Sequence, residues 1–337
     1  MINWAQLPFA YEKTHTNIRC EYQNNAWGTI TSHTDENVNL HMAASCLHYG
    51  QECFEGLKAY RGKDDKIRVF RWEENLRRMN KSANRLSMPS IPAEIFEEAL
   101  RRLINENKDF VPPYGTGASL YIRPLLIGLS PRLGLSPADD YMFVMFCSPV
   151  GPYFKTGLKP VKIIIERDTD RAAPLGTGNV KVGGNYAPAL ITTQKIHNLG
   201  YSAALYLDPK EKKYIDECGP ANFFGIKNNT YVTPDSLSIL QSITNMSLKT
   251  VASEILGLSV EERKVPLTEL SEFEEIGQCG TAAILTPVYE IYDPITKNHY
   301  TYGNPEETGT VCRQLYETLI GIQYGEIPDK FGWNTII

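Results

Sequence analysis

The lysine at position 181 is the side chain of this sequence best suited to covalent chemistry. It stands in the segment GTGNVKVGGNY, with a valine on each side and glycines beyond them. The valines favour a buried, extended backbone, and the glycines allow another group to approach closely. A lysine that loses its hydration there has a lowered pKa, so Lys181 could offer a neutral amine for Schiff-base formation. Spacing alone leaves an ordinary solvated lysine as the alternative.

The spacing of the other reactive side chains supports neither a metal site nor a hydrolytic centre. None of the six histidines belongs to an HExxH motif or to a Cys/His cluster with metal-ligand spacing. The chain lacks a GxSxG motif, and no GxGxxG or Walker sequence follows a predicted strand. The loop GTGNVKVGG is glycine-rich like a phosphate loop, but it has no GK[ST] ending. Nicotinamide and nucleoside-triphosphate enzymes are therefore disfavoured.

Five motifs that follow one another along the chain are typical of one enzyme family. They are YGQECFEGLKAYRG (49–62), SLYIRPLLIG (119–128), GNVKVGGNYAPAL (178–190), DECGPANFF (216–224) and GTAAILTPV (280–288). Together they resemble the class IV pyridoxal-phosphate aminotransferases, and most closely the branched-chain amino-acid aminotransferases. Each motif alone is weak, but five in register over nearly the whole chain are highly specific. The resemblance implies the two-domain class IV fold, with pyridoxal 5′-phosphate in the cleft between the domains.

The resemblance assigns three residues to the cofactor ring. Lys181 matches the lysine that binds the cofactor aldehyde as a Schiff base and then moves the substrate proton. Glu217 matches the acid that faces the pyridine nitrogen, where a carboxylate keeps that nitrogen protonated. Tyr186 matches a tyrosine that hydrogen-bonds the phenolic oxygen. Without the resemblance, Glu217 would be one more exposed acid and Tyr186 a core aromatic at the start of a helix.

The same resemblance gives the cofactor phosphate its ligands. Arg78 aligns with the family arginine, although its position on a helix would otherwise suggest a solvated side chain. The N–H groups of Ile243 and Thr244 stand at the start of a predicted helix, where an anion binds favourably. Thr281 is the further phosphate contact. Many relatives have Pro-Gly before the Ile-Thr pair and an arginine after it, whereas this chain has Gln241, Ser242 and Asn245.

Further matched residues are assigned to the substrate. Aromatic side chains would line an apolar pocket for a branched side chain, although each could equally be ordinary core. An arginine would accept the distal carboxylate of glutamate, a loop tyrosine would help to close the site, and backbone groups would hold the α-carboxylate. The pocket aromatics are Tyr49, Phe54 and Tyr121, and the arginine is Arg123. The loop tyrosine is Tyr153, and the backbone groups are those of Thr281 and Ala282.

The elements that must position these residues can be located from periodicity in the first half of the chain. RVFRW (68–72) alternates as a strand does, and residues 73–86 form a predicted helix that ends before Pro89. A buried stripe at 96, 99, 100 and 103 predicts a second helix. ASLYIRPLLIGL (118–129) and YMFVMFCSPV (141–150) are predicted buried strands.

In the second half, strands and helices again mix without strict alternation. VKIII (161–165) and SAALYLD (202–208) are predicted strands. We expect one helix from near Asn185, with Pro188 in its first turn and Gly200 just past its end. A second helix would end at Gly257, and a third would occupy about 306–323. The fold class is therefore α+β, or mixed α/β.

The length of 337 residues predicts two domains. The apolar pattern lapses at GPYFKTGLKP (151–160), so we expect a small N-terminal α/β domain at 1–150, an interdomain loop at 151–160, and a large domain at 161–337 that carries Lys181. A content of 42% hydrophobic and 22% charged residues is typical of a globular chain. The net charge of −5 disfavours nucleic acid or an anionic membrane as the main partner.

The cysteine pattern and the lack of targeting signals predict a soluble cytoplasmic protein. The seven cysteines are odd in number and form no CxxC, so reduced thiols fit better than disulfides. The segment MINWAQLPFAYEK does not resemble a signal peptide, and no apolar run approaches the roughly 18 to 20 residues of a membrane span.

The resemblance implies a ping-pong transaminase acting in branched-chain amino-acid metabolism. L-Leucine, L-isoleucine or L-valine would give its amino group to the cofactor, and 2-oxoglutarate would take it to form glutamate. Relatives are homodimers, so at least a homodimer is expected. Alternatives are a D-amino-acid aminotransferase, a lyase of the aminodeoxychorismate type, and a cofactor-binding protein without turnover.

Overall fold

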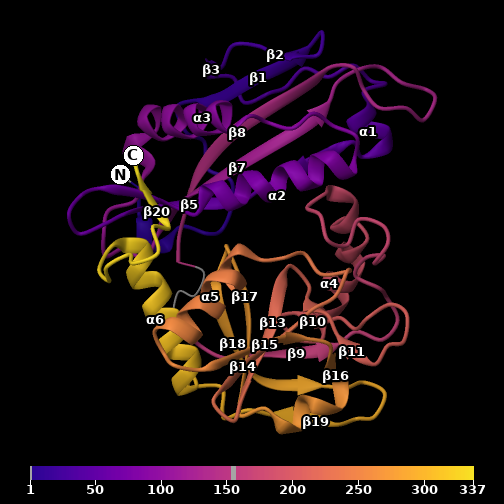
Figure 1. Cartoon of the computed structure of the whole chain (residues 1–337), viewed down its shortest axis with the longest axis vertical. Coiled ribbons are helices and arrows are strands. Elements are labelled where there is room, and N and C mark those ends of the chain that lie inside the picture. Colours follow the sequence, from indigo (N-terminus) through magenta and orange to yellow (C-terminus); the bar gives the residue numbers. More distant parts are fainter. Residues whose placement is uncertain (1, 153–156) are drawn as a thin grey trace. The chain divides into compact units, whose positions relative to one another are not determined.

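The computed structural model describes residues 2–152 and 157–337, which form two compact units (Figure 1). Unit 1 contains the described residues up to 152 together with Val180–Gly183 and Ile322–Ile337, and unit 2 contains residues 157–179 and Gly184–Gly321. The contacts of Lys181 therefore group it with unit 1, whereas the sequence places it in a domain at 161–337. The reason is that the backbone on either side of Lys181 is hydrogen-bonded to residues of unit 1.

Unit 1 is built on an antiparallel sheet. Its strand order is β2-β1-β8-β7-β5-β6-β20, with β3 paired to β1 and β4 paired to β7. The longest pairing joins β7 and β8, whose ten residues each lie opposite one another from end to end. The strands are β1 Asn17–Gln23, β2 Ala26–Trp27, β3 Thr31–His33, β4 Glu52–Phe54, β5 Leu57–Arg61, β6 Ile67–Phe70, β7 Ser119–Gly128, β8 Tyr141–Val150 and β20 Asn334–Ile336.

Two long helices pack against this sheet, α2 Trp72–Arg85 and α3 Ala93–Glu106. The apolar stripe of α3 is fully buried, as its spacing predicts, and Phe96 stacks between Trp72 and Phe143. The predicted bounds of α2, 73–86, agree with the structure to within one residue at each end. The shorter helices of unit 1 are η1 Trp4–Gln6, α1 Ser45–Tyr49 and η2 Lys108–Phe110.

Unit 2 is built on a mixed sheet. Its order is β10-β9-β18-β17-β13-β14-β15, with β12 paired to β13 and β19 paired to β18. The pairs β9–β10, β9–β18 and β14–β15 are parallel and the others are antiparallel, which confirms the mixed fold class. The strands are β9 Val161–Ile165, β10 Ala204–Leu205, β12 Glu217–Cys218, β13 Ala221–Lys227, β14 Thr230–Pro234, β15 Ser259–Arg263, β17 Glu275–Gly280, β18 Ile284–Tyr292 and β19 His299–Thr301, and a separate pair joins β11 Tyr214–Ile215 to β16 Val265–Pro266.

Three α-helices complete the second half of the chain. The amphipathic helix α5 packs on β15 and β17, and its residues Leu248, Val251 and Ala252 are fully buried. Gly257, at a φ of +68°, turns the chain after it, as the sequence predicts. The helices are η3 Gly183–Asn185, α4 Ala189–Asn198, α5 Ile243–Glu254, η4 Leu267–Glu272 and α6 Thr310–Tyr324.

Two predicted helix starts were too early. The helix expected near Asn185 begins at Ala189, because the Asn185 side chain bonds to both the backbone and the hydroxyl of Thr177 and holds the preceding residues in a turn. The last helix begins at Thr310 rather than near 306. The Asn304 side chain accepts the N–H groups of residues 306 and 307, which are thereby kept in a separate turn.

The strand expected at 202–208 was too long. Only Ala204–Leu205 pairs with β9, at the edge of the sheet. From Tyr206 onward the backbone exchanges hydrogen bonds with Asp216 and Glu217 instead. A change of partner within one apolar run is a tertiary event that the run itself does not encode. In the described part of the chain, no helix combines the length and the apolar character that crossing a bilayer requires.

The buried stripe of α3 supplies a direct test of the unit 1 core. Leu100 is fully buried, so Leu100→Ala should lower the free energy of unfolding by about 2 to 5 kcal/mol through lost burial and a residual cavity. The control in the same helix is Glu97→Ala, which removes a half-exposed ion pair with Arg101 worth less than about 1 kcal/mol. Urea unfolding followed by circular dichroism measures both. Equal losses from the two variants would contradict the assignment of this face to the core.

Candidate functional site

The backbone around Lys181 is fixed by three hydrogen bonds within unit 1. The Lys181 N–H donates to Oγ of Ser82 at 2.9 Å, and the Lys181 carbonyl accepts from the N–H of Phe54 at 3.2 Å. The N–H of Gly183 donates to the Glu52 carboxylate at 2.5 Å. A Cβ atom at Gly183 would lie 2.2 Å from that carboxylate, so a larger residue there would displace the Glu52 side chain from its present position. The neighbours Val180 and Val182 are buried in the unit 1 core.

The amine of Lys181 is largely withdrawn from water. Its Nζ lies 4.7 Å from the centre of the Phe54 ring. Burial, reinforced by the nearby charge of Arg78, lowers the pKa of Lys181 to about 8, while Glu55 acts in the opposite sense. The neutral fraction of this amine near neutral pH is therefore larger than that of a free lysine, and only the neutral amine can attack a carbonyl.

An aromatic and cationic group surrounds Phe54. The Cζ atom of Arg123 lies 4.8 Å from the centre of the Phe54 ring and 5.4 Å from that of Tyr121, and its Nη2 donates to the Tyr121 hydroxyl at 3.1 Å. The Nε of Arg123 is buried and has no hydrogen-bond partner among the described residues. A Cβ atom at Gly56 would lie 2.1 Å from the Tyr121 hydroxyl, so a larger residue there would displace the Tyr121 ring. Three of the predicted substrate residues are thus brought together.

Arg78 is held in a buried ion pair that the sequence did not reveal. Its Nε lies 2.6 Å from Oε1 of Glu55 and its Nη2 lies 2.8 Å from Oε2. Glu55 is fully buried, and although burial opposes its ionisation, Arg78 and Lys181 hold the pKa of its carboxyl below the ordinary value. The available sequence signal was the acid that stands between Phe54 and Gly56 in the motif YGQECFEGLKAYRG.

One predicted substrate tyrosine, Tyr49, is not found in this group. Tyr49 ends α1 and is 41% exposed, and its hydroxyl donates to the carbonyl of Leu133. Its described contacts do not include the residues around Lys181. Tyr153 lies outside the described residues.

In unit 2, Glu217 is a buried carboxyl with several polar partners. It is 2% exposed, accepts from Nδ2 of Asn222 at 3.0 Å, and accepts from the N–H of Leu240 at 3.3 Å. Nε of Arg171 lies 2.6 Å from its Oε1, as an ion pair without hydrogen-bond geometry. Burial outweighs the attraction of Arg171 and raises the pKa of Glu217 to about 7. The alternative of an exposed surface acid is wrong.

Arg171 is a second residue that sequence reasoning missed. Its Nη2 donates to the carbonyls of Gly178, at 2.6 Å, and of Ser238. A Cβ atom at Gly178 would lie 2.7 Å from Cα of Ser238, which explains why the GTG segment needs a glycine there. Arg171 thus joins the loop before Lys181 to the segment that leads into α5.

The amino terminus of α5 is linked to Glu217 through one amide. Oδ1 of Asn222 accepts from the N–H of Ser242 at 3.2 Å, while its Nδ2 binds Glu217. Oγ of Ser242 caps the helix by accepting from the N–H of Asn245 at 3.2 Å. Ile243 and Thr244 form the first turn, whose N–H groups have no intrahelical acceptor and favour an anion. Gln241 and Ser242, which stand here where many relatives have Pro-Gly, are therefore compatible with a helix terminus that binds an anion.

The remaining predicted residues of unit 2 lie in turns. Thr281 and Ala282 connect β17 to β18 and are partly exposed. The turn ends at Ile284, which has a φ of +66°, a conformation rarely adopted by a β-branched residue and often kept at functional sites. Tyr186 follows η3 and is partly buried.

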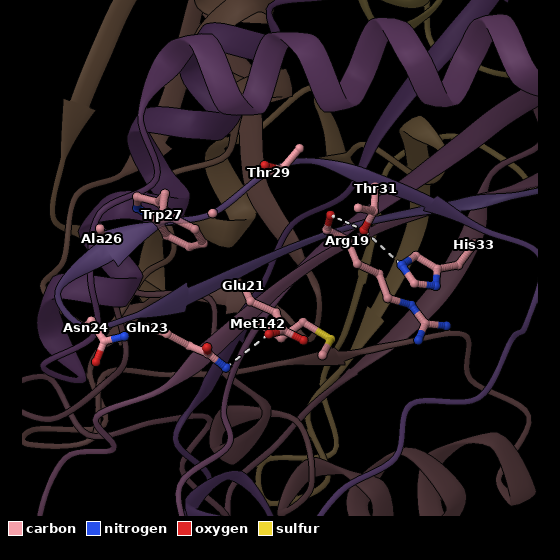
Figure 2. A pocket seen from close by; sticks show the side chains of 11 residues that line it. Arg19, Glu21, Gln23, Asn24, Ala26, Trp27, Thr29, Thr31, His33 and Met142 are labelled. Carbon is pink, nitrogen blue, oxygen red and sulfur yellow. Dashed lines mark hydrogen bonds between the residues drawn. The ribbon is translucent and has the colours of Figure 1, made fainter.

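A large open groove lies elsewhere in unit 1, on β1 to β3 and Met142 (Figure 2). Its volume is about 570 Å³, and it contains none of the predicted site residues. Several of its polar side chains pair with one another, including Gln23 with Glu21 at 3.0 Å and Thr31 with His33 at 2.9 Å. The groove therefore offers no group comparable to the Lys181 amine.

Comparison with known proteins identifies the family to which this chain belongs. The model of the family described as amino-transferase class IV matches residues 52–291. A branched-chain-amino-acid aminotransferase of Haemophilus influenzae is 44% identical over 338 residues, covering 98% of each chain. The chain belongs to the class IV aminotransferases. It is accordingly a transaminase that depends on pyridoxal 5′-phosphate.

Solved structures show the same fold. The branched-chain amino acid aminotransferase of Escherichia coli superposes with a TM-score of 0.78 at 27% identity, covering 94% of this chain and 98% of that one. A T.th. branched-chain amino acid aminotransferase with pyridoxamine 5′-phosphate gives 0.75 at 25% identity, covering 94% and 97%. The donor set of this chain fits the cofactor, because it includes a poorly hydrated amine, a buried carboxyl and a capped helix terminus.

The depressed pKa of Lys181 can be measured in the cofactor-free enzyme. Because burial disfavours the ammonium form, the reaction of Lys181 with an amine reagent should reach half its maximal rate near pH 8, well below the value of ~10.4 for a free lysine. Competitive labelling followed by peptide mapping measures this rate, and Lys181→Arg identifies the labelled peptide. A rate that still rises steeply at pH 10 would contradict the burial of the amine.

Proposed function

We propose that this transaminase transfers the amino group of L-leucine, L-isoleucine or L-valine to 2-oxoglutarate by a ping-pong mechanism. The observation that carries the proposal is the group beside Lys181, where the apolar ring of Phe54 lies against Arg123. Such a group offers an apolar wall to a branched side chain and a cation to the distal carboxylate of glutamate. The Nε of Arg123, which has no hydrogen-bond partner in the part of the chain that the structure describes, is a donor suited to that carboxylate.

Each cofactor-binding residue has a role that follows from its chemistry. When bound, pyridoxal phosphate supplies an aldehyde and an electron-accepting ring. Lys181 holds the cofactor and transfers the proton at the substrate Cα. Glu217 would keep a proton on the ring nitrogen, and Tyr186 would donate to the phenolic oxygen. Arg78 binds the phosphate.

The remaining assignments concern backbone groups and the loop. The first-turn N–H groups of Ile243 and Thr244 would bind the phosphate together with Thr281. Backbone groups at Thr281 and Ala282 would hold the substrate α-carboxylate, and Tyr153 would help to exclude water. The N–H donors would bind the α-carboxylate, which branched-chain and glutamate substrates share, and Arg123 would bind the distal carboxylate of glutamate. Both kinds of substrate would then be oriented in the same way.

We also propose that the enzyme is a cytoplasmic homodimer. Five large apolar side chains of unit 1 are exposed in two segments, and these two segments are tied together by a bridge between Ala44 and Pro131. An exposed apolar cluster of this kind is typical of a protein interface. The side chains, which we call the apolar patch, are Met42, Leu47, Tyr49, Leu133 and Leu135.

A second copy of the chain is the occupant that relatives suggest for this patch. In those dimers the small domain of one subunit reaches the site of the other, which accounts for the position of Tyr49 away from Lys181 of its own chain. The seven cysteines are free and six are buried, which suits a reducing compartment such as the cytoplasm.

The reaction is tested by following the two half-reactions separately. L-Leucine should convert the bound aldehyde absorbance to that of the amine form, and 2-oxoglutarate should restore it. Lys181→Ala should slow the first conversion by at least about 10²-fold, because the proton-transferring amine is lost. Lys195→Ala, at an exposed lysine, should leave it unchanged. Reaction with D-leucine instead, or release of pyruvate from an aminodeoxychorismate, would contradict the proposal.

The homodimer is tested by placing charge in the apolar patch. Leu133→Asp combined with Leu135→Asp should shift the enzyme from dimer to monomer in sedimentation equilibrium, because two buried carboxylates would face an apolar partner. Ile295→Asp changes a similarly exposed residue of unit 2 and serves as the control. A dimer that persists in the double variant would place the interface elsewhere.

A further inference from the structure

We propose that Glu55 is a positioning residue that fixes the guanidinium of Arg78 and so determines how tightly the enzyme binds the phosphate group of its cofactor. The proposal rests on the proposed role of Arg78. It concerns a carboxylate that none of the cofactor or substrate assignments uses.

The Glu55 carboxylate accepts four hydrogen bonds from residues that the structure describes. Oε1 accepts from Nε of Arg78 at 2.6 Å. Oε2 accepts from Nη2 of Arg78 at 2.8 Å, from Nδ2 of Asn75 at 2.7 Å and from the N–H of Gly56 at 3.1 Å. The two bonds from Arg78 are parallel, and such a bidentate pair fixes both the position and the plane of a guanidinium.

The carboxylate itself is held in place by the backbone. The N–H of Glu55 donates to the carbonyl of Pro124 on β7 at 2.8 Å, and the preceding N–H, of Phe54, donates to the carbonyl of Lys181 at 3.2 Å. Glu55 is fully buried and Arg78 is 7% exposed, so neither side chain can exchange this partner for water. One short segment therefore anchors both the Arg78 guanidinium and the Lys181 backbone.

An amide cannot reproduce this arrangement. Glutamine has one acceptor oxygen, and its NH₂ group would face at least one of the donors from Arg78 or Asn75. Glu55→Gln keeps the volume of the side chain but releases Arg78 from its bidentate partner. If Glu55 acts by positioning, the variant should lose affinity for a ligand that carries phosphate and keep affinity for one that lacks it.

The test compares the binding of pyridoxal phosphate and of pyridoxal to the cofactor-free enzyme. Both bind Lys181 through the aldehyde, and only the first has a phosphate. We expect Glu55→Gln to weaken the binding of pyridoxal phosphate by about tenfold or more, beyond any change in the binding of pyridoxal. A loss of this size is typical of a lost charge-assisted hydrogen bond. Equal weakening of both ligands, or unchanged or tighter pyridoxal phosphate binding, would overturn the proposal.

Asp293→Asn is the matched control. Asp293 is also buried and accepts four hydrogen bonds, two from Arg167 and the others from Ile295 and Thr296, but it lies in unit 2 outside the predicted site. Asp293→Asn should change the binding of the two ligands equally, if at all. A loss specific to pyridoxal phosphate in this variant would show that breaking any buried ion pair suffices, and would overturn the proposal.

A double-mutant cycle shows whether Glu55 acts through Arg78. In an Arg78→Gln background, Glu55→Gln should produce no further loss specific to pyridoxal phosphate. A further loss there would overturn the proposal. If Glu55→Gln does not fold, Glu55→Asp keeps the charge but withdraws both oxygens from Arg78, and the same two ligands decide the outcome. Failure of the unaltered enzyme to bind either ligand at Lys181 would contradict the proposed function instead.

Discussion

The burial of ionisable groups is the constraint on which the rest of this structure depends. A lysine amine is useful for carbonyl chemistry only when part of it is neutral, and removal from water achieves this by destabilising the ammonium form. In unit 1, Val180 and Val182 are buried in the core on either side of Lys181. Ser82, Phe54 and Glu52 form hydrogen bonds with the backbone of this segment. The chemistry of Lys181 is thus a consequence of packing, because the same side chain on a solvated loop would remain charged.

In unit 2, burial acts in the same way on an acid, the carboxyl group of Glu217. Burial raises the pKa of Glu217 to about 7 and lowers that of Lys181 to about 8, so both groups are displaced toward neutral pH from opposite sides. Environments that move acids and bases in this way are typical of catalytic sites. Asn222 couples Glu217 to the capped start of α5, so the carboxyl and the anion-binding helix terminus are fixed by one side chain.

Arginines balance these buried acids in both units. Arg78 pairs with Glu55, and Arg171 lies against Glu217. A buried ion pair is weak evidence for stability, because desolvation offsets much of the attraction between the charges. Its value here is geometric: each arginine is held at a defined position by groups that cannot rotate away into water. Glycines at 56, 178 and 183 allow the close approaches that these arrangements require.

Residue order was sufficient to predict the family, the mixed fold class, the helices around 73–86 and 96–103, and the burial of the two valines that flank Lys181. Those features depend on local periodicity or on motifs that neighbouring residues complete. Only the folded chain reveals that Glu55 and Arg171 are partners of Arg78 and Glu217, that the apolar run 202–208 changes partner after Leu205, and that Val180–Gly183 groups with unit 1. The physical reason is that each depends on a pairing between residues distant in sequence, and an acid or an apolar run carries no local sign of which distant group will neutralise or cover it.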